Sequence, residues 1–420
     1  MSARRIAIVG AGPIGLETAL RASREGCEVV VFEAGRVAEH FAQYGPVRLF
    51  TPFRMNSTAL GRELLHAAGA KLPDDEEVLT AAELRERYLL PLSRLPELSG
   101  AIRGETRIGA VAREGSSKGT SRERAAGRPF LLRIERSGAG PAGLERADAV
   151  IDASGVYATA NATGPGGLPS LGEESLGDRV ERRLPDILGQ GRAHYAGKRI
   201  LLVGDGRSAA NAIADLDQMV RAGGEGARTR LEWIHRERGG DALAPAPAGE
   251  LEALPVLRDL TQRATQIARE ASWIRHHPGA TIGGFRVLPS GAIEATLAGA
   301  GGDESRIEVD RVLALVGYRP DPSLFRELQI HLCYASEGPM ALAAAILAAG
   351  AKDPSGSQGC LGQVSHGPET LRNPEPDFYI LGAKSYGRNP DFLLTIGHQQ
   401  IEDVMTLLAA SRSQLNLAPR

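Results

Sequence analysis

The most constraining feature of the sequence is a glycine-rich turn that directly follows a short apolar run. Residues 6–9 (Ile-Ala-Ile-Val) are β-branched and apolar, a pattern typical of a buried parallel strand. They lead into residues 10–15 (Gly-Ala-Gly-Pro-Ile-Gly), after which a helical pattern covers residues 16–24. A second apolar run at residues 28–32 ends at Glu33. The order strand, glycine turn, helix, strand predicts a βαβ unit and an α/β fold.

The glycine spacing in this turn fits the G-x-G-x-x-G pattern of a dinucleotide-binding loop. The first glycine permits the tight turn, the second lets a pyrophosphate approach the backbone, and the third allows the helix to pack closely on the strand. Glu33 lies 18 residues after Gly15, where a carboxylate can accept a hydrogen bond from a ribose 2′-hydroxyl. The cofactor-binding residues expected here are Gly10, Gly12, Pro13, Ile14, Gly15, Glu33 and Ala34.

The same order of elements recurs in the middle of the chain. A strand-like run at residues 199–203 leads into a second glycine turn, a helix to about residue 220 and a strand at residues 231–235. No acidic residue ends this strand; His235 and Arg236 occupy its end instead. Because an arginine can pair with a 2′-phosphate, this end of the strand favours NADPH over NADH. The alternative is that the arginine merely belongs to a solvated strand end. The connection from the helix to this strand is long, so the residue that corresponds to Glu33 is uncertain by one or two positions. The expected nucleotide-binding residues are Gly204, Gly206, Arg207, Ser208, Ala209, His235 and Arg236.

Two further segments, residues 148–155 and 310–317, share the pattern Asp-x-Val-(Ile/Leu) with a glycine seven residues after the aspartate. Each is expected to be the last strand of its own unit, at a crossover between domains. The sequence therefore predicts two Rossmann-like, three-layer domains, the NAD(P) domain being inserted into the FAD domain. The expected boundaries are 1–160 (FAD domain, first part), 161–311 (NAD(P)H domain) and 312–420 (FAD domain, second part).

This organisation resembles the flavoproteins with two dinucleotide-binding domains, a superfamily that includes flavin-containing monooxygenases, N-hydroxylases, thioredoxin and glutathione reductases and quinone reductases. The resemblance covers nearly the whole chain and implies FAD in the first domain and NADPH, or NADH, in the second. It also implies that residues 378–383 are a returning FAD segment, followed by a helix from about residue 397 whose dipole stabilises negative charge on the reduced flavin. Further cofactor-binding residues implied are Val111, Ser154, Gly155 and Gly382. Members of the disulfide-reductase type carry an aspartate just after that last glycine, where this chain has Ala383-Lys384.

The reaction depends on what faces the flavin. Residues 49–58 loosely resemble the Asn-containing run of flavin-containing monooxygenases, so Asn56 is a candidate to stabilise a C4a-hydroperoxyflavin; a polar loop cap is the alternative. His398 is a second candidate, for contact with flavin or substrate, against a purely structural role. Lys384, Tyr386 and Arg388 lie in a polar loop that could bind a carboxylate or the nucleotide, or be a solvated turn.

The leading hypothesis is an FAD-dependent monooxygenase that oxygenates a small molecule at nitrogen or sulfur with molecular oxygen. The three cysteines of the chain include no closely spaced pair, which disfavours the usual disulfide reductases. The alternatives are electron transfer to a disulfide or quinone through Cys333 and Cys360, or a non-catalytic redox-sensing flavoprotein.

Composition limits the partners. Lys and Arg total 49 against 51 Asp and Glu, a net charge of -2, which gives no general attraction for nucleic acid or anionic membranes. Because the cysteines are few and scattered and no apolar run approaches the roughly 18 residues that a membrane span requires, we expect a cytoplasmic protein without a membrane segment. Its oligomeric state is open, a homodimer included. Residues 256–275 are expected to be helical, and the adjacent histidines His276 and His277 lack the spacing of a helical metal pair, so no metal site is predicted.

Overall fold

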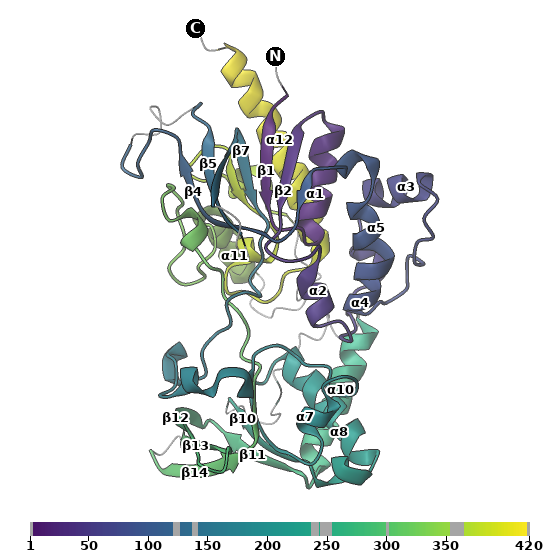
Figure 1. The fold of residues 1–420 in the computed structure, drawn as a ribbon, viewed down its shortest axis with the longest axis vertical. Helices are drawn as coiled ribbons and strands as arrows, with labels where there is room; N and C mark the ends of the chain where they lie inside the picture. The colour runs from purple at the N-terminus through teal and green to yellow at the C-terminus, as the bar shows by residue number, and fades with distance from the viewer. Residues whose placement is uncertain are drawn as a thin grey trace. The chain divides into compact units, whose positions relative to one another are not determined.

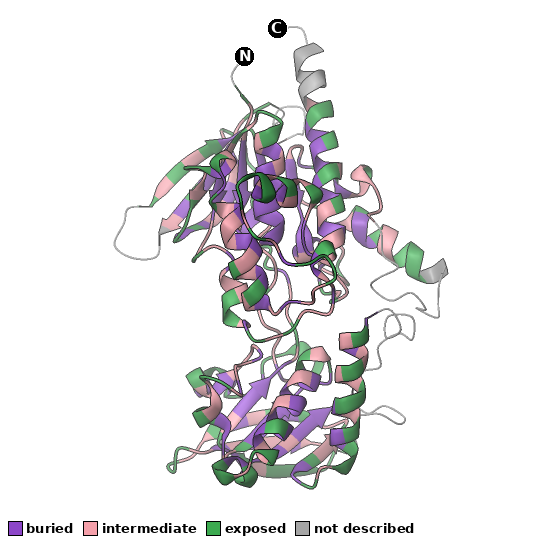
Figure 2. Ribbon diagram, turned by 90° about the vertical axis from the view of Figure 1, so that its right-hand side faces the viewer, coloured by how far each residue is buried: buried purple, intermediate pink, exposed green. Residues whose placement is uncertain are grey.

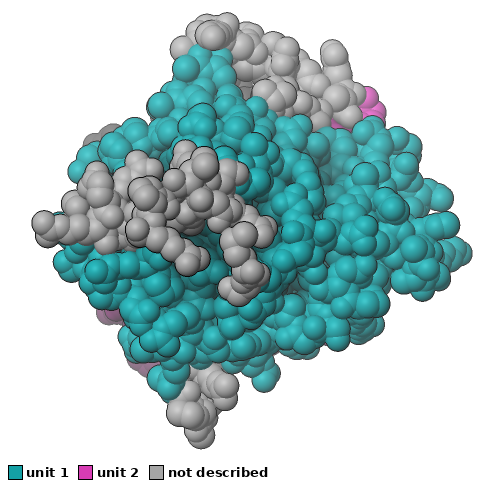
Figure 3. Space-filling model, turned by 90° about the horizontal axis from the view of Figure 1, so that it is seen from above, with its two compact units in different colours: residues 1–42, 51–159, 319–420 teal, residues 43–50, 160–318 magenta. Residues whose placement is uncertain are grey.

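The chain forms two compact units in a computed structural model. The residues that it describes are 3–120, 127–136, 142–236, 243, 254–299, 302–352 and 365–417. Unit 1 comprises residues 1–42, 51–159 and 319–420, and unit 2 comprises residues 43–50 and 160–318 (Figures 1 and 3). The sequence predicted that the second domain ends at residue 311, but unit 2 ends at Tyr318. The reason is that the strand at residues 311–314 pairs within the sheet of unit 2.

The centre of unit 1 is a five-stranded parallel sheet with the order β16-β7-β1-β2-β3. Its strands are β1 (Arg5–Val9), β2 (Glu28–Phe32), β3 (Ile102–Arg103), β7 (Ala149–Asp152) and β16 (Phe378–Ile380). Alternation along β1 sends Ala7 and Val9 into one core cluster with Val111 and Phe130 of a second, antiparallel sheet. That sheet consists of β4 (Thr106–Arg113), β5 (Phe130–Arg136) and β6 (Gly143–Ala147).

Helices complete unit 1. They are α1 (Pro13–Arg24), α2 (Glu39–Gln43), α3 (Ala59–Ala67), α4 (Ala81–Leu84), α5 (Leu90–Ser93), α11 (Met340–Lys352) and α12 (Leu394–Leu417). Helices α1 and α12, although far apart in sequence, pack against each other (Figure 1). The amino ends of both helices thereby come together.

Unit 2 repeats the design with a parallel sheet in the order β11-β10-β9-β15-β8. These strands are β8 (Val180–Glu181), β9 (Arg199–Val203), β10 (Arg230–His235), β11 (Ile274–Pro278) and β15 (Arg311–Ala314). Its helices are α7 (Arg192–Tyr195), α8 (Arg207–Arg221) and α10 (Pro255–Glu270). An antiparallel sheet follows, formed by β12 (Thr281–Val287), β13 (Ile293–Ala298) and β14 (Glu304–Val309).

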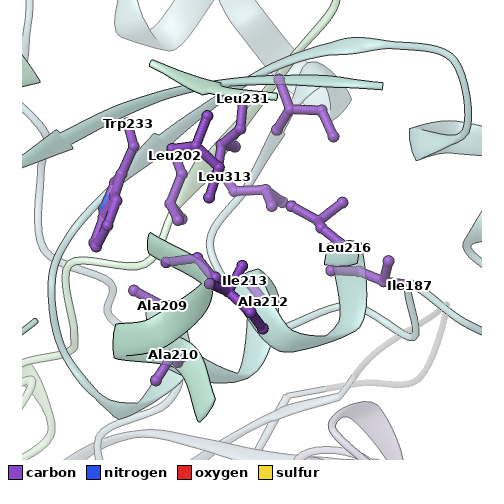
Figure 4. Packing of buried hydrophobic residues seen from close by; sticks show 14 of the residues in the cluster. Ile187, Leu202, Ala209, Ala210, Ala212, Ile213, Leu216, Leu231, Trp233 and Leu313 are labelled. Atoms are coloured by element: carbon purple, nitrogen blue, oxygen red, sulfur yellow. The ribbon is translucent and has the colours of Figure 1, made fainter. Parts of the chain in front are cut away.

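The core of unit 2 lies on both faces of its parallel sheet. On one face, Ile213 and Leu216 of α8 pack with Leu202 and Leu313 of the strands (Figure 4). On the other face, residues of the antiparallel sheet form a second cluster. The predicted helix at 256–275 is too long: α10 ends at Glu270, and the residues after it enter β11.

The pattern of burial follows these layers. The central strands of both units are buried, while the outer faces of the helices are exposed (Figure 2). Among the residues that the structure describes, none of the helices combines the length and the apolar character needed to span a bilayer.

Candidate functional site

The glycine loop of unit 1 connects β1 to α1, and its three glycines meet different surroundings. Gly10 has φ +105°, and a Cβ there would lie 2.7 Å from the carbonyl oxygen of Ala153. At Gly15 a Cβ would lie 1.9 Å from the carbonyl oxygen of Gly10, so the helix can sit this close only without a side chain. A Cβ at Gly12 would meet nothing within 4 Å. The loop is therefore packed tightly behind its first and third glycines and open at the second, where a phosphate could approach the helix amino end.

Glu33 joins this loop to the end of β2. Its Oε2 accepts the N–H of Ala11 at 2.7 Å, and its Oε1 accepts the N–H of Gly35 at 2.9 Å. Each carboxylate oxygen can accept a further hydrogen bond. The carboxylate is thus fixed beside the loop with acceptor capacity left for ribose hydroxyls, and Ala34 lies in the same turn.

The segment that begins at Gly382 lies beside β7 and contains a buried ion pair. Lys384 Nζ lies 2.7 Å from Asp152 Oδ2 and donates to Ser154 Oγ at 3.1 Å, while Ser154 Oγ donates to Asp152 Oδ1 at 2.6 Å. The side chains of Lys384 and Asp152 are 3% and 0% exposed. Burial of either charge alone would be very costly, so each requires the other. Lys384 consequently contributes no free positive charge, although the sequence placed it in a polar loop.

The amino end of α12 reaches the glycine loop. A Cβ on Gly397 would lie 2.3 Å from Ile14 Cδ1, which shows how closely the first turn of α12 approaches α1. Near this contact, His398 Nε2 and Tyr386 Oη are buried and have no hydrogen-bond partner among the described residues. Burial, with a smaller effect of Arg62, lowers the pKa of His398 to about 4, and burial raises the pKa of Tyr386 to about 12. Two neutral polar groups are thus left unsatisfied where a ligand's polar edge could complete them.

Other predicted residues of unit 1 have different surroundings. Asn56 is buried, and its amide is used within its own loop: Nδ2 donates to the carbonyls of Thr51 and Pro52, and Oδ1 accepts from Thr51 Oγ1 at 2.9 Å. This matches the loop-cap alternative, and the geometry gives no direct support to a catalytic role. Val111 is 1% exposed and packs in the core of unit 1. Gly155, after β7, has φ +72° and open space around a Cβ.

The glycine loop of unit 2 has the same form. Gly204 has φ +123°, a Cβ there would lie 2.4 Å from the carbonyl oxygen of Leu315, and a Cβ at Gly206 would meet nothing within 4 Å. Ala209, at the third position, is fully buried, and Ser208 is exposed. Arg207 begins α8, and its guanidinium carbon lies 6.0 Å from the ring centre of Phe50.

Hydrogen bonds define the register that the sequence left open. In unit 1 the N–H of Gly10 donates to the carbonyl of Phe32, and in unit 2 the N–H of Gly204 donates to the carbonyl of Ile234. The residue after each acceptor is Glu33 in the first unit and His235 in the second. His235 therefore occupies the position that corresponds to Glu33, the carboxylate predicted to contact a ribose, and Arg236 comes next.

Arg236 is held over the loop by Asp205, the residue between the first two glycines. Its Nη2 and Nε donate to the two carboxylate oxygens of Asp205 at 2.9 and 3.1 Å. The Asp205 side chain is 4% exposed, whereas that of Arg236 is 75% exposed. The guanidinium is thus oriented by a buried carboxylate while most of its surface faces solvent, which suits a residue that meets a charged ligand.

Cys333, one of the two cysteines considered for electron transfer, is partly exposed and free. Hydrogen bonds from the backbone and side chain of Ser336 lower the pKa of its thiol. Cys360 lies outside the described residues.

No family model and no curated protein matches the sequence. Among solved structures, bacillithiol disulfide reductase Bdr (YpdA) from Bacillus cereus aligns with a TM-score of 0.67 at 16% identity, covering 97% of this chain and 100% of its own. DfoA from Erwinia amylovora, a cadaverine monooxygenase bound to FAD, aligns with a TM-score of 0.65 at 15% identity, with coverages of 98% and 95%.

The ornithine hydroxylase PvdA from Pseudomonas aeruginosa aligns with a TM-score of 0.63 at 16% identity, covering 98% of this chain and 100% of its own. Reductases and hydroxylases thus share one architecture with this chain, which confirms the expected α/β fold. The chain has the fold of the flavoproteins with two dinucleotide-binding domains.

Proposed function

We propose that the protein is an FAD-dependent oxidoreductase that NADPH reduces, and that it oxygenates a small molecule at nitrogen or sulfur. The observation that carries the proposal is the pair of equivalent glycine loops with different residues at one position. Glu33 suits an unphosphorylated ribose, and His235 with Arg236 suits a ribose that bears a phosphate. A chain with one loop of each kind can hold two different dinucleotides.

Unit 1 is the proposed FAD site. The open face of Gly12 and the amino end of α1 would receive the pyrophosphate, and Glu33 would accept hydrogen bonds from the ribose. The unsatisfied His398 Nε2 and Tyr386 Oη fit the polar edge of a flavin at the amino end of α12. A bound flavin would supply the hydride-accepting and oxygen-activating chemistry, and the protein would orient it and exclude water.

Unit 2 is the proposed NADPH site, with NADH as the weaker alternative. Gly206 and the amino end of α8 would receive the pyrophosphate, and Arg236 would pair with the 2′-phosphate. Asp205 would position that guanidinium, since it already holds two of its nitrogen atoms.

Oxygenation is the proposed reaction because the three cysteines of the chain include no closely spaced pair, which disfavours the usual disulfide reductases. Two proteins with this fold are a cadaverine monooxygenase and an ornithine hydroxylase. The neutral His398 could donate or accept a hydrogen bond but would not supply a proton near neutral pH, because its pKa is about 4. Asn56 would act indirectly, by fixing the loop at residues 51–56.

The test is anaerobic reduction of the purified protein by NADPH and, separately, by NADH, followed by rapid mixing with oxygen while flavin spectra are recorded. We expect faster reduction by NADPH and a transient spectrum that matches neither reduced nor oxidised flavin. Direct reoxidation without that transient would contradict the oxygenase proposal. Absence of bound flavin after addition of FAD would contradict the assignment of unit 1.

The lowered pKa of the Cys333 thiol favours a second candidate, electron transfer to a disulfide or quinone. Cys333→Ser, Cys360→Ser and the double variant separate the two. An oxygenase should keep its NADPH-dependent activity in all three variants, whereas a thiol relay should lose it, together with any long-wavelength absorbance from a thiolate next to the flavin.

A further inference from the structure

Two imidazoles meet at the carboxyl end of the parallel sheet in unit 2. His235 ends β10, and His276 lies on the neighbouring strand β11, opposite Trp233 in the register. His235 Nε2 and His276 Nδ1 are 3.3 Å apart, and the two ring centres are 5.4 Å apart. Trp233 packs against both rings, with centre distances of 4.7 and 5.2 Å, and its Nε1 donates to the carbonyl of Gly204 at 2.8 Å. The pair is thus built into the glycine loop of this unit.

The outer nitrogen of each ring faces a backbone carbonyl. His235 Nδ1 lies 3.1 Å from the carbonyl oxygen of Arg236, and His276 Nε2 lies 2.8 Å from that of Ala268 in α10. A carbonyl oxygen can only accept, so both outer nitrogens must carry a proton. In two neutral imidazoles these are all the ring protons available, and the two inner nitrogens then face each other as bare acceptors. The central contact becomes a hydrogen bond only when one more proton enters, which gives the pair a charge of +1.

Neighbouring groups set how readily that proton enters. Burial lowers the pKa of His235, its hydrogen bond to the Arg236 carbonyl raises it, the adjacent His276 and His277 lower it, and Asp205 raises it. His277 points to the other face of the sheet, where its Nε2 lies 2.7 Å from Glu232 Oε2. The charged and titratable groups that influence His235 include Asp205 after β9 and His277 on β11; Arg236 follows directly after β10, and α10 contributes the Ala268 carbonyl. Burial of His235 thus opposes entry of the third proton when no ligand is bound.

We propose that His235 and His276 act as one proton-accepting pair that takes up a proton when the 2′-phosphate of NADPH binds at the end of β10. The inference rests on the proposed NADPH site and adds His276 to it as a positioning residue. A dianionic phosphate beside His235 favours the charged pair. The proton comes from solvent and bonds to an inner nitrogen, and no other covalent bond changes. NADH has no 2′-phosphate and should bind without proton uptake.

Calorimetry on the full-length protein tests the proposal with the oxidised nucleotides, so that no flavin chemistry intervenes. NADP⁺ and NAD⁺ are titrated at about pH 7.5 in two buffers with different heats of protonation. We expect uptake of about one proton per NADP⁺ and none for NAD⁺. The 2′-phosphate, whose second pKa is about 6, would itself release protons on binding as the dianion, so it cannot produce an uptake.

Variants assign the uptake to the pair. His276→Phe keeps an aromatic ring at this position but removes both ring nitrogens. Proton uptake should therefore disappear, and NADP⁺ affinity should fall several-fold. His276→Gln, which retains an acceptor toward His235 and a donor toward Ala268, should restore part of the uptake, and it serves as the second variant if His276→Phe does not fold. Arg236→Ala is the matched control: NADP⁺ should bind more weakly but still with proton uptake.

Binding of NADP⁺ without proton uptake, or the same uptake in His276→Phe as in the unaltered protein, would overturn this inference while leaving the nucleotide assignment in place. No binding of NADP⁺ would overturn the nucleotide assignment and this inference with it.

Discussion

The glycine loops of units 1 and 2 have the same backbone and differ in the residue that ends the second strand. Both have a first glycine at positive φ pressed against a neighbouring carbonyl, and a second glycine that faces open space. The equivalent position then carries Glu33 in unit 1 and His235 in unit 2. Under the proposed function, the backbone would provide phosphate binding in both units, and the side chains after the second strand would select the nucleotide.

The two units also use ion pairs differently at these loops. In unit 1 the Lys384–Asp152 pair is almost fully buried, whereas in unit 2 the Arg236 side chain of the Arg236–Asp205 pair is 75% exposed. A buried pair holds the fold together, and an exposed guanidinium is available to a ligand.

Lys384→Met should have the largest effect, because it leaves Asp152 as an uncompensated charge in a fully buried position. We expect the free energy of unfolding to fall by about 3–5 kcal/mol. Arg236→Met, the matched change in unit 2, should cost less, about 1–2 kcal/mol, because Asp205 is buried but the guanidinium that is lost is 75% exposed. Urea unfolding monitored by circular dichroism measures both, and similar losses would contradict the contrast.

Stability should depend on pH through His398. Its pKa is about 4 in the folded protein against an ordinary value of 6.5, so below pH 6.5 the unfolded chain takes up a proton that the folded chain does not. The free energy of unfolding should therefore be constant above about pH 6.5 and fall toward pH 4, by at most about 3 kcal/mol from this residue. His398→Phe should flatten the curve in this window. An unchanged slope would show that His398 is not buried as a neutral group.

Gly15→Ala and Ala209→Gly exchange the residues at the third position of the two loops. The alanine in unit 1 would place its Cβ 1.9 Å from the carbonyl oxygen of Gly10, so we expect a loss of about 1–3 kcal/mol and less bound flavin. The glycine in unit 2 should cost only about 0.5–1 kcal/mol, the usual effect within a helix. Flavin content per protein and the thermal midpoint check both; equal effects would mean that the loops are packed alike.

The smallest effect is expected from His235→Glu combined with Arg236→Ala, which gives unit 2 the carboxylate of unit 1. The new charge should repel a 2′-phosphate and accept from a ribose hydroxyl, so the ratio of NADPH to NADH affinity should fall about tenfold. Fluorescence titration of both nucleotides measures this ratio. Glu33→Gln serves as the control in unit 1 and should leave the ratio unchanged.

The sequence predicted the local parts of this design well. Both glycine loops and the βαβ order could be read directly, because their geometry is specified by neighbouring residues. The equivalence of His235 with Glu33 could not be predicted from the sequence, because it depends on the Gly204–Ile234 hydrogen bond across two strands.

Other features depended on contacts between distant segments. His276 had no predicted role because the residues just before it were expected to be helical; only the parallel pairing of β10 and β11 brings it to His235. Lys384 was expected in a polar loop because no residue near it in the sequence indicates its ion pair with Asp152. Asp152 lies more than two hundred positions earlier. Polar residues whose partners come from another strand are the ones that sequence patterns miss.

Trp233 gives this molecule a built-in optical reporter. The chain has two tryptophans, and this one donates its indole N–H to the first glycine of the unit 2 loop while its ring packs on both paired imidazoles. Excited indole passes an electron readily to a protonated imidazole. The fluorescence intensity of Trp233 should therefore decrease when the His235–His276 pair becomes charged. Arrival of a phosphorylated nucleotide could then be followed in real time from intrinsic fluorescence, with no added dye, and the other tryptophan, Trp273, can be replaced to isolate the signal.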